Sequence, residues 1–226
     1  MFIRENEWEA ANTLWLWPSP SVSMDFRSHL ATVTKRDRAD LIALALGALA
    51  VRAHERVGLI GAPFAPGHAR PALVRIAEWV AERKGASLPE AQRMTKLSSA
   101  VLVGDFFEPP EAIAKSLTRI AAAGVTGHLI QVVDPAEETL PYAGRMEFHD
   151  MAGPLTFLAN KTESLRDAYG AKFASHRERL RDIAHRLGWT FTVHRTDQPV
   201  ARLLMVMHGL IGGARSRAFA TGGMAR

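Results

Sequence analysis

The feature that most constrains the fold of this chain is an alternation of short apolar runs with longer amphipathic segments. Runs typical of β-strands are followed by segments with helical spacing of apolar residues, and this pattern predicts a mostly parallel sheet with helices on both faces. The expected strands lie at 8–17, 56–61, 97–103, 125–133 and 189–194, and the expected helices at 37–54, 69–83, 109–124, 162–187 and 196–211. The predicted class is therefore α/β, a three-layer, doubly wound sheet.

The most apolar of these segments indicate which parts lie deepest. The run that ends at Trp17 is apolar enough for a strand buried on both faces. The segment 37–54 is apolar on nearly every side, which is typical of a helix packed against a sheet and other helices. We therefore expect Trp15 and Trp17 to be core residues and not a stacking platform for a ligand.

The regular pattern is interrupted in three places. Residues 144–150 and 155–159 are typical of two short strands, which we expect to form a hairpin at a sheet edge. The loop 62–68 leaves room for a strand that the pattern does not resolve. From residue 212 on, glycine, serine and arginine dominate. We therefore predict one domain over 1–211 and a disordered basic tail over 212–226.

Composition excludes several classes of protein. The 226 residues are 47% hydrophobic and include no cysteine, which rules out disulfides, thiolate metal sites and a cysteine nucleophile. The net charge of +5 is too small to indicate nucleic-acid binding. No signal peptide is visible, and the longest apolar stretch, Leu41 to Val51, is too short to span a bilayer. We expect a cytoplasmic protein without a transmembrane segment.

Polar side chains follow two of the predicted strands. Ser19, Ser21 and Ser23 come after the first strand, and Asp105 follows the strand at 97–103. In an extended chain the three hydroxyls point to one side, and parallel strands deliver their carboxyl ends to one edge of the sheet. The pattern favours either a polar loop capped by serines or a Mg²⁺ site with few charged ligands, made of three hydroxyls and one carboxylate.

The order of several short motifs resembles a known family. The chain is similar to the bacterial domain-of-unknown-function 58 family, whose fold is like that of the von Willebrand factor A domain. The motifs are Phe2-Ile3-Arg4-Glu5-Asn6-Glu7-Trp8-Glu9, Ser21-Val22-Ser23-Met24-Asp25-Phe26, Arg56-Val57-Gly58-Leu59, Leu102-Val103-Gly104-Asp105-Phe106, Asp134-Pro135-Ala136-Glu137, Tyr169 and Gly188-Trp189 to Asp197. The resemblance extends to about residue 210.

The resemblance implies a degenerate metal-ion-dependent adhesion site. Related domains hold a divalent ion with an Asp-x-Ser-x-Ser motif, and here Ser19 stands in place of the aspartate, followed by Ser21 and Ser23. Asp105 matches a later aspartate, whereas the loop 62–68 contains no threonine for the remaining ligand. With one carboxylate fewer, we expect Mg²⁺ binding to be weak and no other cofactor to be bound.

The chain also departs from the family at its start. Members usually carry a longer N-terminal segment with a Gly-rich, Arg- and Tyr-containing motif and an Asp-Trp pair, and this chain begins inside the stretch that follows them. We expect an N-terminally shortened member: a short paralogue, a mis-assigned start or a truncated gene.

These observations lead to three hypotheses about function. The resemblance implies a non-enzymatic protein-binding or adaptor module that works with a MoxR-type AAA+ ATPase encoded beside it. The alternatives are a metal-assisted phosphate-ester hydrolase and weak nucleic-acid binding through the basic tail. An enzyme is disfavoured because no nucleophile pair, general base or second carboxylate converges in the sequence, and no Gly-x-Ser-x-Gly, P-loop or dinucleotide motif is present. Asp134 to Glu137 is expected to be a structural turn.

Overall fold

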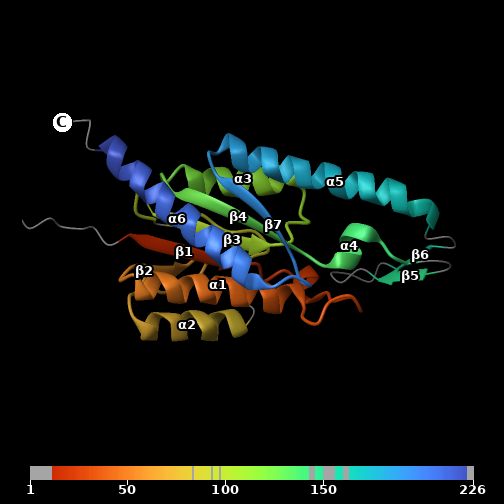
Figure 1. The fold of residues 1–226 in the computed structure, drawn as a ribbon, viewed down its shortest axis with the longest axis horizontal. Helices are drawn as coiled ribbons and strands as arrows, with labels where there is room; N and C mark the ends of the chain where they lie inside the picture. The colour runs from red at the N-terminus through yellow and green to blue at the C-terminus, as the bar shows by residue number, and fades with distance from the viewer. Residues whose placement is uncertain are drawn as a thin grey trace, which may run out of the picture.

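Five parallel strands form the central sheet of the computed structural model, in the order β2-β1-β3-β4-β7 (Figure 1). Their bounds are Thr13–Pro18 for β1, Arg56–Leu59 for β2, Ser99–Gly104 for β3, Thr126–Val133 for β4 and Thr190–Arg195 for β7. The structure describes residues 12–222 apart from Arg83, Arg93, Leu97, 143–145, 150–155 and 160–162. Residues 8–11 of the first predicted strand lie outside the described residues.

Helices cover both faces of this sheet. Figure 1 shows α1 and α2 along one side of the strands and α3 and α5 along the other. The bounds are Lys35–Arg52 for α1, Arg70–Ala81 for α2, Pro110–Ala121 for α3, Glu163–Arg186 for α5 and Val200–Gly222 for α6. The prediction of a three-layer α/β fold with a parallel, doubly wound sheet is confirmed.

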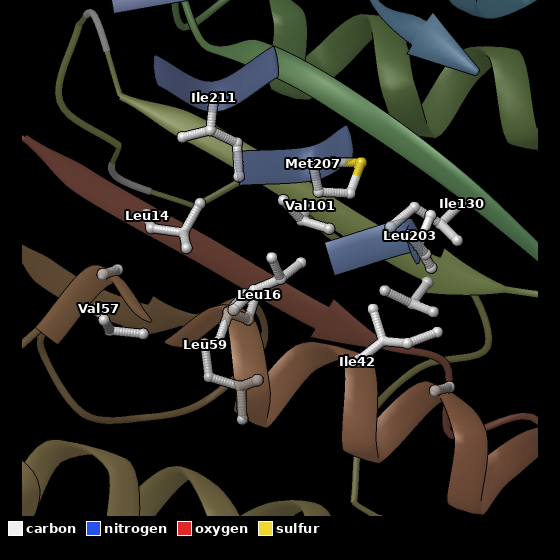
Figure 2. Packing of buried hydrophobic residues seen from close by; sticks show 14 of the residues in the cluster. Leu14, Leu16, Ile42, Val57, Leu59, Val101, Ile130, Leu203, Met207 and Ile211 are labelled. Atoms are coloured by element: carbon white, nitrogen blue, oxygen red, sulfur yellow. The ribbon is translucent and has the colours of Figure 1, made fainter. Parts of the chain in front are cut away.

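Alternating side chains of β1 point into the two halves of the hydrophobic core, one on each face of the sheet. Leu14 and Leu16 pack on the face covered by α1 and α6, and Figure 2 shows Leu203, Met207 and Ile211 of α6 reaching toward the strands on that face. The tryptophans Trp15 and Trp17 point to the other face, where α3 and α5 pack. Both indoles are buried, which confirms that they are core residues.

Four shorter elements, η1, α4, β5 and β6, lie between the main strands and helices. A 3₁₀ turn, η1 (Val22–Asp25), follows β1, and the five-residue helix α4 (Pro135–Thr139) follows β4. Strands β5 (Met146–His149) and β6 (Thr156–Ala159) pair antiparallel, as the predicted hairpin requires. Their placement at the edge of the main sheet was wrong, because they form a sheet of their own and β7 is the strand that pairs with β4.

Two regions predicted to be irregular carry secondary structure. The loop 62–68 contributes one isolated antiparallel bridge, Val57 to Gly67, and not a full strand. At the other end, α6 runs past residue 212, where the sequence predicts the start of a basic tail, as far as Gly222. The segment after the two glycines is rich in alanine and arginine, which are strong helix formers, and it contains no proline to end the helix. Residues 223–226 lie outside the described residues.

Within the part of the chain that the structure describes, no helix combines the length and the apolar character that crossing a bilayer requires.

His194 on β7 lies in an environment that opposes its protonation. Its side chain is 3% exposed, and its Nε2 atom has no hydrogen-bond partner among the described residues. Burial, assisted by the nearby Arg38 guanidinium, lowers the pKa of His194 from 6.5 to about 4. Arg38 is held in place by its own bonds to the carbonyls of Thr196 and Gln198, at 2.7 and 2.9 Å.

This arrangement predicts a loss of stability in mild acid. Below pH 6.5 His194 becomes protonated in the unfolded chain, whereas in the folded chain it becomes protonated only near pH 4. The stability that His194 contributes above pH 6.5 is therefore lost as the pH falls. We expect wild type to lose about 2 kcal/mol more than His194→Gln between pH 7 and 4.5. Urea denaturation at both pH values measures this, with His185→Gln, an exposed histidine on α5, as the control. Equal pH dependence of wild type and His194→Gln would contradict it.

Candidate functional site

The ends of β1 and β3 bring the serine loop and Asp105 to one edge of the sheet. The two strands are parallel neighbours, with Pro18 opposite Val103, and the Ser19 backbone N–H donates to the Val103 carbonyl at 2.8 Å. Gly104 permits this approach, since a Cβ atom there would lie 2.9 Å from Ser19 Cβ. The strand order reverses direction between β1 and β3, so this edge is the switch point at which doubly wound folds bind ligands.

The three hydroxyls bond within their own loop. Ser19 Oγ accepts the Ser21 backbone N–H at 3.3 Å, and the Ser21 and Ser23 hydroxyls lie 2.9 Å apart. Because η1 begins at Val22, with Met24 N–H donating to the Ser21 carbonyl, the extended alternation expected through Ser23 ends at Ser21. Among the described residues, no hydrogen bond joins these hydroxyls to Asp105.

Asp105 instead binds a lysine that the sequence pattern did not single out. Lys35 is 0% exposed, and its Nζ atom lies 2.8 Å from Asp105 Oδ2 and 2.6 Å from Glu137 Oε1. The same ammonium lies 4.5 Å from the centre of the Phe107 ring and 5.8 Å from that of Phe26. We call Lys35, Asp105 and Glu137 the edge triad.

The start of α1 explains why Lys35 was missed. We expected the helix to begin at about residue 37, with Asp37 in the cap. In the structure Thr34 is the N-cap, its Oγ1 accepts the Asp37 backbone N–H at 3.0 Å, and the Asp37 carboxylate accepts the Thr34 N–H. Lys35 is therefore the first helical residue. A cation is unfavourable at that end of a helix dipole, and this is the only local signal that Lys35 needs a buried acidic partner.

Glu137 and Asp134 belong to the turn that follows β4. Glu137 Oε2 accepts the Asp134 N–H at 2.9 Å, while the Asp134 carboxylate accepts from the Ala136 and Ser28 N–H groups. The turn predicted for Asp134 to Glu137 is thus a capping box at the start of α4. Burial raises the pKa of Glu137 above its ordinary value, and the Lys35 ammonium opposes this rise.

An aromatic cleft lies beside the edge triad. Phe106 adopts a left-handed backbone conformation, φ +54°, and is buried, whereas Phe107 is 40% exposed. The Phe106 carbonyl accepts a 2.6 Å bond from His176 Nε2 of α5. The Phe107 ring lies edge-on to Phe173 and His176, with ring centroids 6.2 and 6.4 Å away. The Tyr169 ring stacks on Phe173 at 6.0 Å. The resulting cleft has a volume of about 740 Å³.

A smaller hollow of about 200 Å³ lies at the ends of β1 and β2. Its wall includes Ser19, Arg36 and Asp40. Arg36 donates to the Ser21 carbonyl at 2.8 Å and to Asp25 Oδ1 at 2.5 Å. Asp25, which the sequence places out of register with the metal-binding motif, is therefore ion-paired to Arg36.

The residues at this edge do not fit a divalent metal ion. Asp105, the one carboxylate of the predicted set, is 1% exposed and is neutralised by an internal ammonium. Ser19, Ser21 and Ser23 offer neutral oxygens that already bond within their loop. Across the described residues, no group of three or more His, Cys, Asp or Glu side chains is arranged to hold a metal ion.

Comparison with known proteins identifies the family. No curated protein matches the chain. At 12% identity and a TM-score of 0.49, 90% of the chain is similar to the whole of an aerotolerance-related membrane protein from Bacteroides fragilis NCTC 9343. At 11% identity and a TM-score of 0.44, 91% of it is similar to the whole of the conserved hypothetical protein BatB from Bacteroides thetaiotaomicron.

The family model described as "Protein of unknown function DUF58" matches residues 1–179, most of the 226-residue chain. This match confirms the resemblance seen in the sequence motifs, and the chain belongs to the DUF58 family.

Proposed function

We propose that this chain is a non-enzymatic, cytoplasmic protein-binding module, and that its partner is a MoxR-type AAA+ ATPase. In this proposal the partner docks on the aromatic cleft beside the edge triad. The observation that carries the proposal is the exposed Phe107 ring in a cleft that combines aromatic and basic side chains. Aromatic residues and arginine are the side chains most enriched where proteins bind one another.

The chemistry of the cleft favours an acidic partner segment with an apolar anchor. Lys172, His176 and Arg179 are among the lining residues, and none of the lining residues is acidic. The Arg177 guanidinium lies 4.9 Å from the centre of the Phe173 ring, but its charge is offset by an ion pair with Glu138. Burial raises the pKa of Tyr169 to about 12, so its phenol stays protonated and offers a neutral hydrogen-bond donor.

The same edge gives little support to catalysis. Both carboxylates of the edge triad are bonded to Lys35, and a protonated Tyr169 cannot act as a base. A metal-assisted phosphate-ester hydrolase would need carboxylates free to hold the ion and activate water. The geometry therefore favours binding over hydrolysis.

Binding of the purified chain to the MoxR-type ATPase encoded beside it tests the proposal. We expect Phe107→Ala to weaken binding at least about tenfold, as removal of a central aromatic anchor does. The charge reversals Lys172→Glu and Arg179→Glu should weaken binding further and reduce its sensitivity to salt. Calorimetry or biolayer interferometry at two salt concentrations provides the measurement.

Two controls separate docking from folding and from net charge. Val74→Ala removes an exposed apolar side chain from α2, on the opposite face of the sheet. Arg70→Glu, at the exposed start of the same helix, changes the net charge as each reversal does. The docking proposal fails if folded Phe107→Ala binds the ATPase as tightly as wild type, and the choice of partner fails if wild type does not bind at low salt.

A further inference from the structure

Two carboxylates, Asp105 at 1% exposure and Glu137 at 12%, share one positive charge at the carboxyl edge of the sheet. Asp105 comes from the end of β3 and Glu137 from the turn after β4, and each bonds to the same Nζ atom. Carboxylates that both lie within hydrogen-bond distance of one point cannot both stay ionised in a buried site without a cation between them. Lys35 supplies that cation from α1.

The ammonium leaves no room for a hydrated ion beside it. Two of its three N–H donors are accounted for by Asp105 and Glu137, and the Phe107 ring closes a further side. The lysine side chain is fully buried. A magnesium ion, which gives up its water ligands reluctantly, would have to displace the lysine to reach the two carboxylates.

We infer that Lys35 is the resident cation of this edge: its ammonium holds the position in which Asp105 and Glu137 would otherwise bind a divalent metal ion. The wild-type edge is then complete without a metal. The resident cation is a property of the edge itself and does not depend on which partner docks on the cleft.

The remaining oxygens show that the position suits a metal once the lysine is removed. Asp105 Oδ1 is buried and has no hydrogen-bond partner among the described residues. Together with Asp105 Oδ2 and Glu137 Oε1 it would provide three hard oxygen ligands, and water can fill the space left by the lysine chain. Oxygen sets of this kind, completed by water, are what Mg²⁺ and Mn²⁺ prefer.

Substitution of Lys35 by alanine therefore should make the protein respond to divalent ions. We expect Mn²⁺ at about a hundred times its dissociation constant to raise the melting temperature of Lys35→Ala by roughly 5–10 °C. Wild type and Lys115→Ala, in which an exposed lysine of α3 is removed, should show no shift. Electron paramagnetic resonance of free Mn²⁺ gives a second readout, with one ion bound by Lys35→Ala and none by wild type.

Each outcome decides the inference. Addition of Asp105→Asn to Lys35→Ala should abolish both the shift and the bound Mn²⁺. A saturable Mn²⁺ shift in wild type that Asp105→Asn removes would overturn the inference. If Lys35→Ala folds poorly, it should refold better with Mn²⁺ than with a chelator, and a variant that gains nothing from Mn²⁺ in either assay overturns it as well.

Discussion

Lys35→Met is expected to lower the free energy of unfolding by about 3–5 kcal/mol at pH 7, because it leaves the buried Asp105 and the partly buried Glu137 without their cation. Methionine keeps most of the lysine volume, so the loss reports on charge and not on a cavity. Lys35 contacts both Asp105 and Glu137 at hydrogen-bond distance, and none of its side chain reaches solvent. Chemical denaturation of wild type and variant gives the difference directly.

Acid provides an internal check on this cause. Burial raises the pKa of Glu137, and its protonation removes one of the two negative charges that Lys35 balances. The deficit of Lys35→Met relative to wild type should therefore shrink as the pH falls from 7 to 5. Lys115→Met, which removes an exposed lysine on α3, should stay within about 0.5 kcal/mol of wild type. A deficit of less than about 1 kcal/mol for Lys35→Met would mean that the ion pair adds little beyond its own desolvation.

Gly127→Ala is expected to cost about 3 kcal/mol or more, because the methyl group would overlap an indole. A Cβ atom built at Gly127 lies 1.8 Å from Cδ2 and 2.0 Å from Cε3 of Trp189. Gly127 is the second residue of β4, and Trp189, just before β7, is buried in the half of the core that α3 and α5 cover. Neither backbone nor ring can move far in a packed core, so overpacking is costly there.

The remedy for this overlap is a smaller side chain at position 189. Addition of Trp189→Leu should recover part of the stability that Gly127→Ala loses, a coupling that a double-mutant cycle measures. Gly170→Ala is the matched control, since a Cβ atom at Gly170 meets nothing within 4 Å and alanine is the better helix former in α5. If Gly127→Ala and Gly170→Ala unfold at the same denaturant concentration, the close approach of Trp189 to Gly127 does not affect the free energy of unfolding.

The strands and helices could be predicted because each leaves a local pattern. The periodicity that predicted a strand at 125–133 and a helix at 162–187 matches β4 and α5 to within one residue at each end. Adjacent parallel strands also place Ser19 and Asp105 at one edge, as inferred from the alternation of elements. These features depend only on residues close together in the chain and on the rules of sheet topology.

The contacts of the site could not be predicted in this way. Lys35 is 70 residues from Asp105 and 102 from Glu137, and no spacing rule links positions so far apart. The serine motif misled for a local reason, since the chain turns into η1 before Ser23. The predicted helix began at residue 37, two residues late, and this placed Lys35 outside the helix.

The bridge between Val57 and Gly67 has a consequence for how copies of this chain behave at high concentration. Val57 N–H donates to the Gly67 carbonyl at 2.7 Å and Gly67 N–H donates back at 3.0 Å, on the outer side of β2. Exposed strand borders invite addition of further chains and growth of fibrils, and a single reciprocal pair beside Pro66 uses the groups that would start such growth. We therefore expect this one loop residue to reduce edge-to-edge association of β2 between copies of the chain.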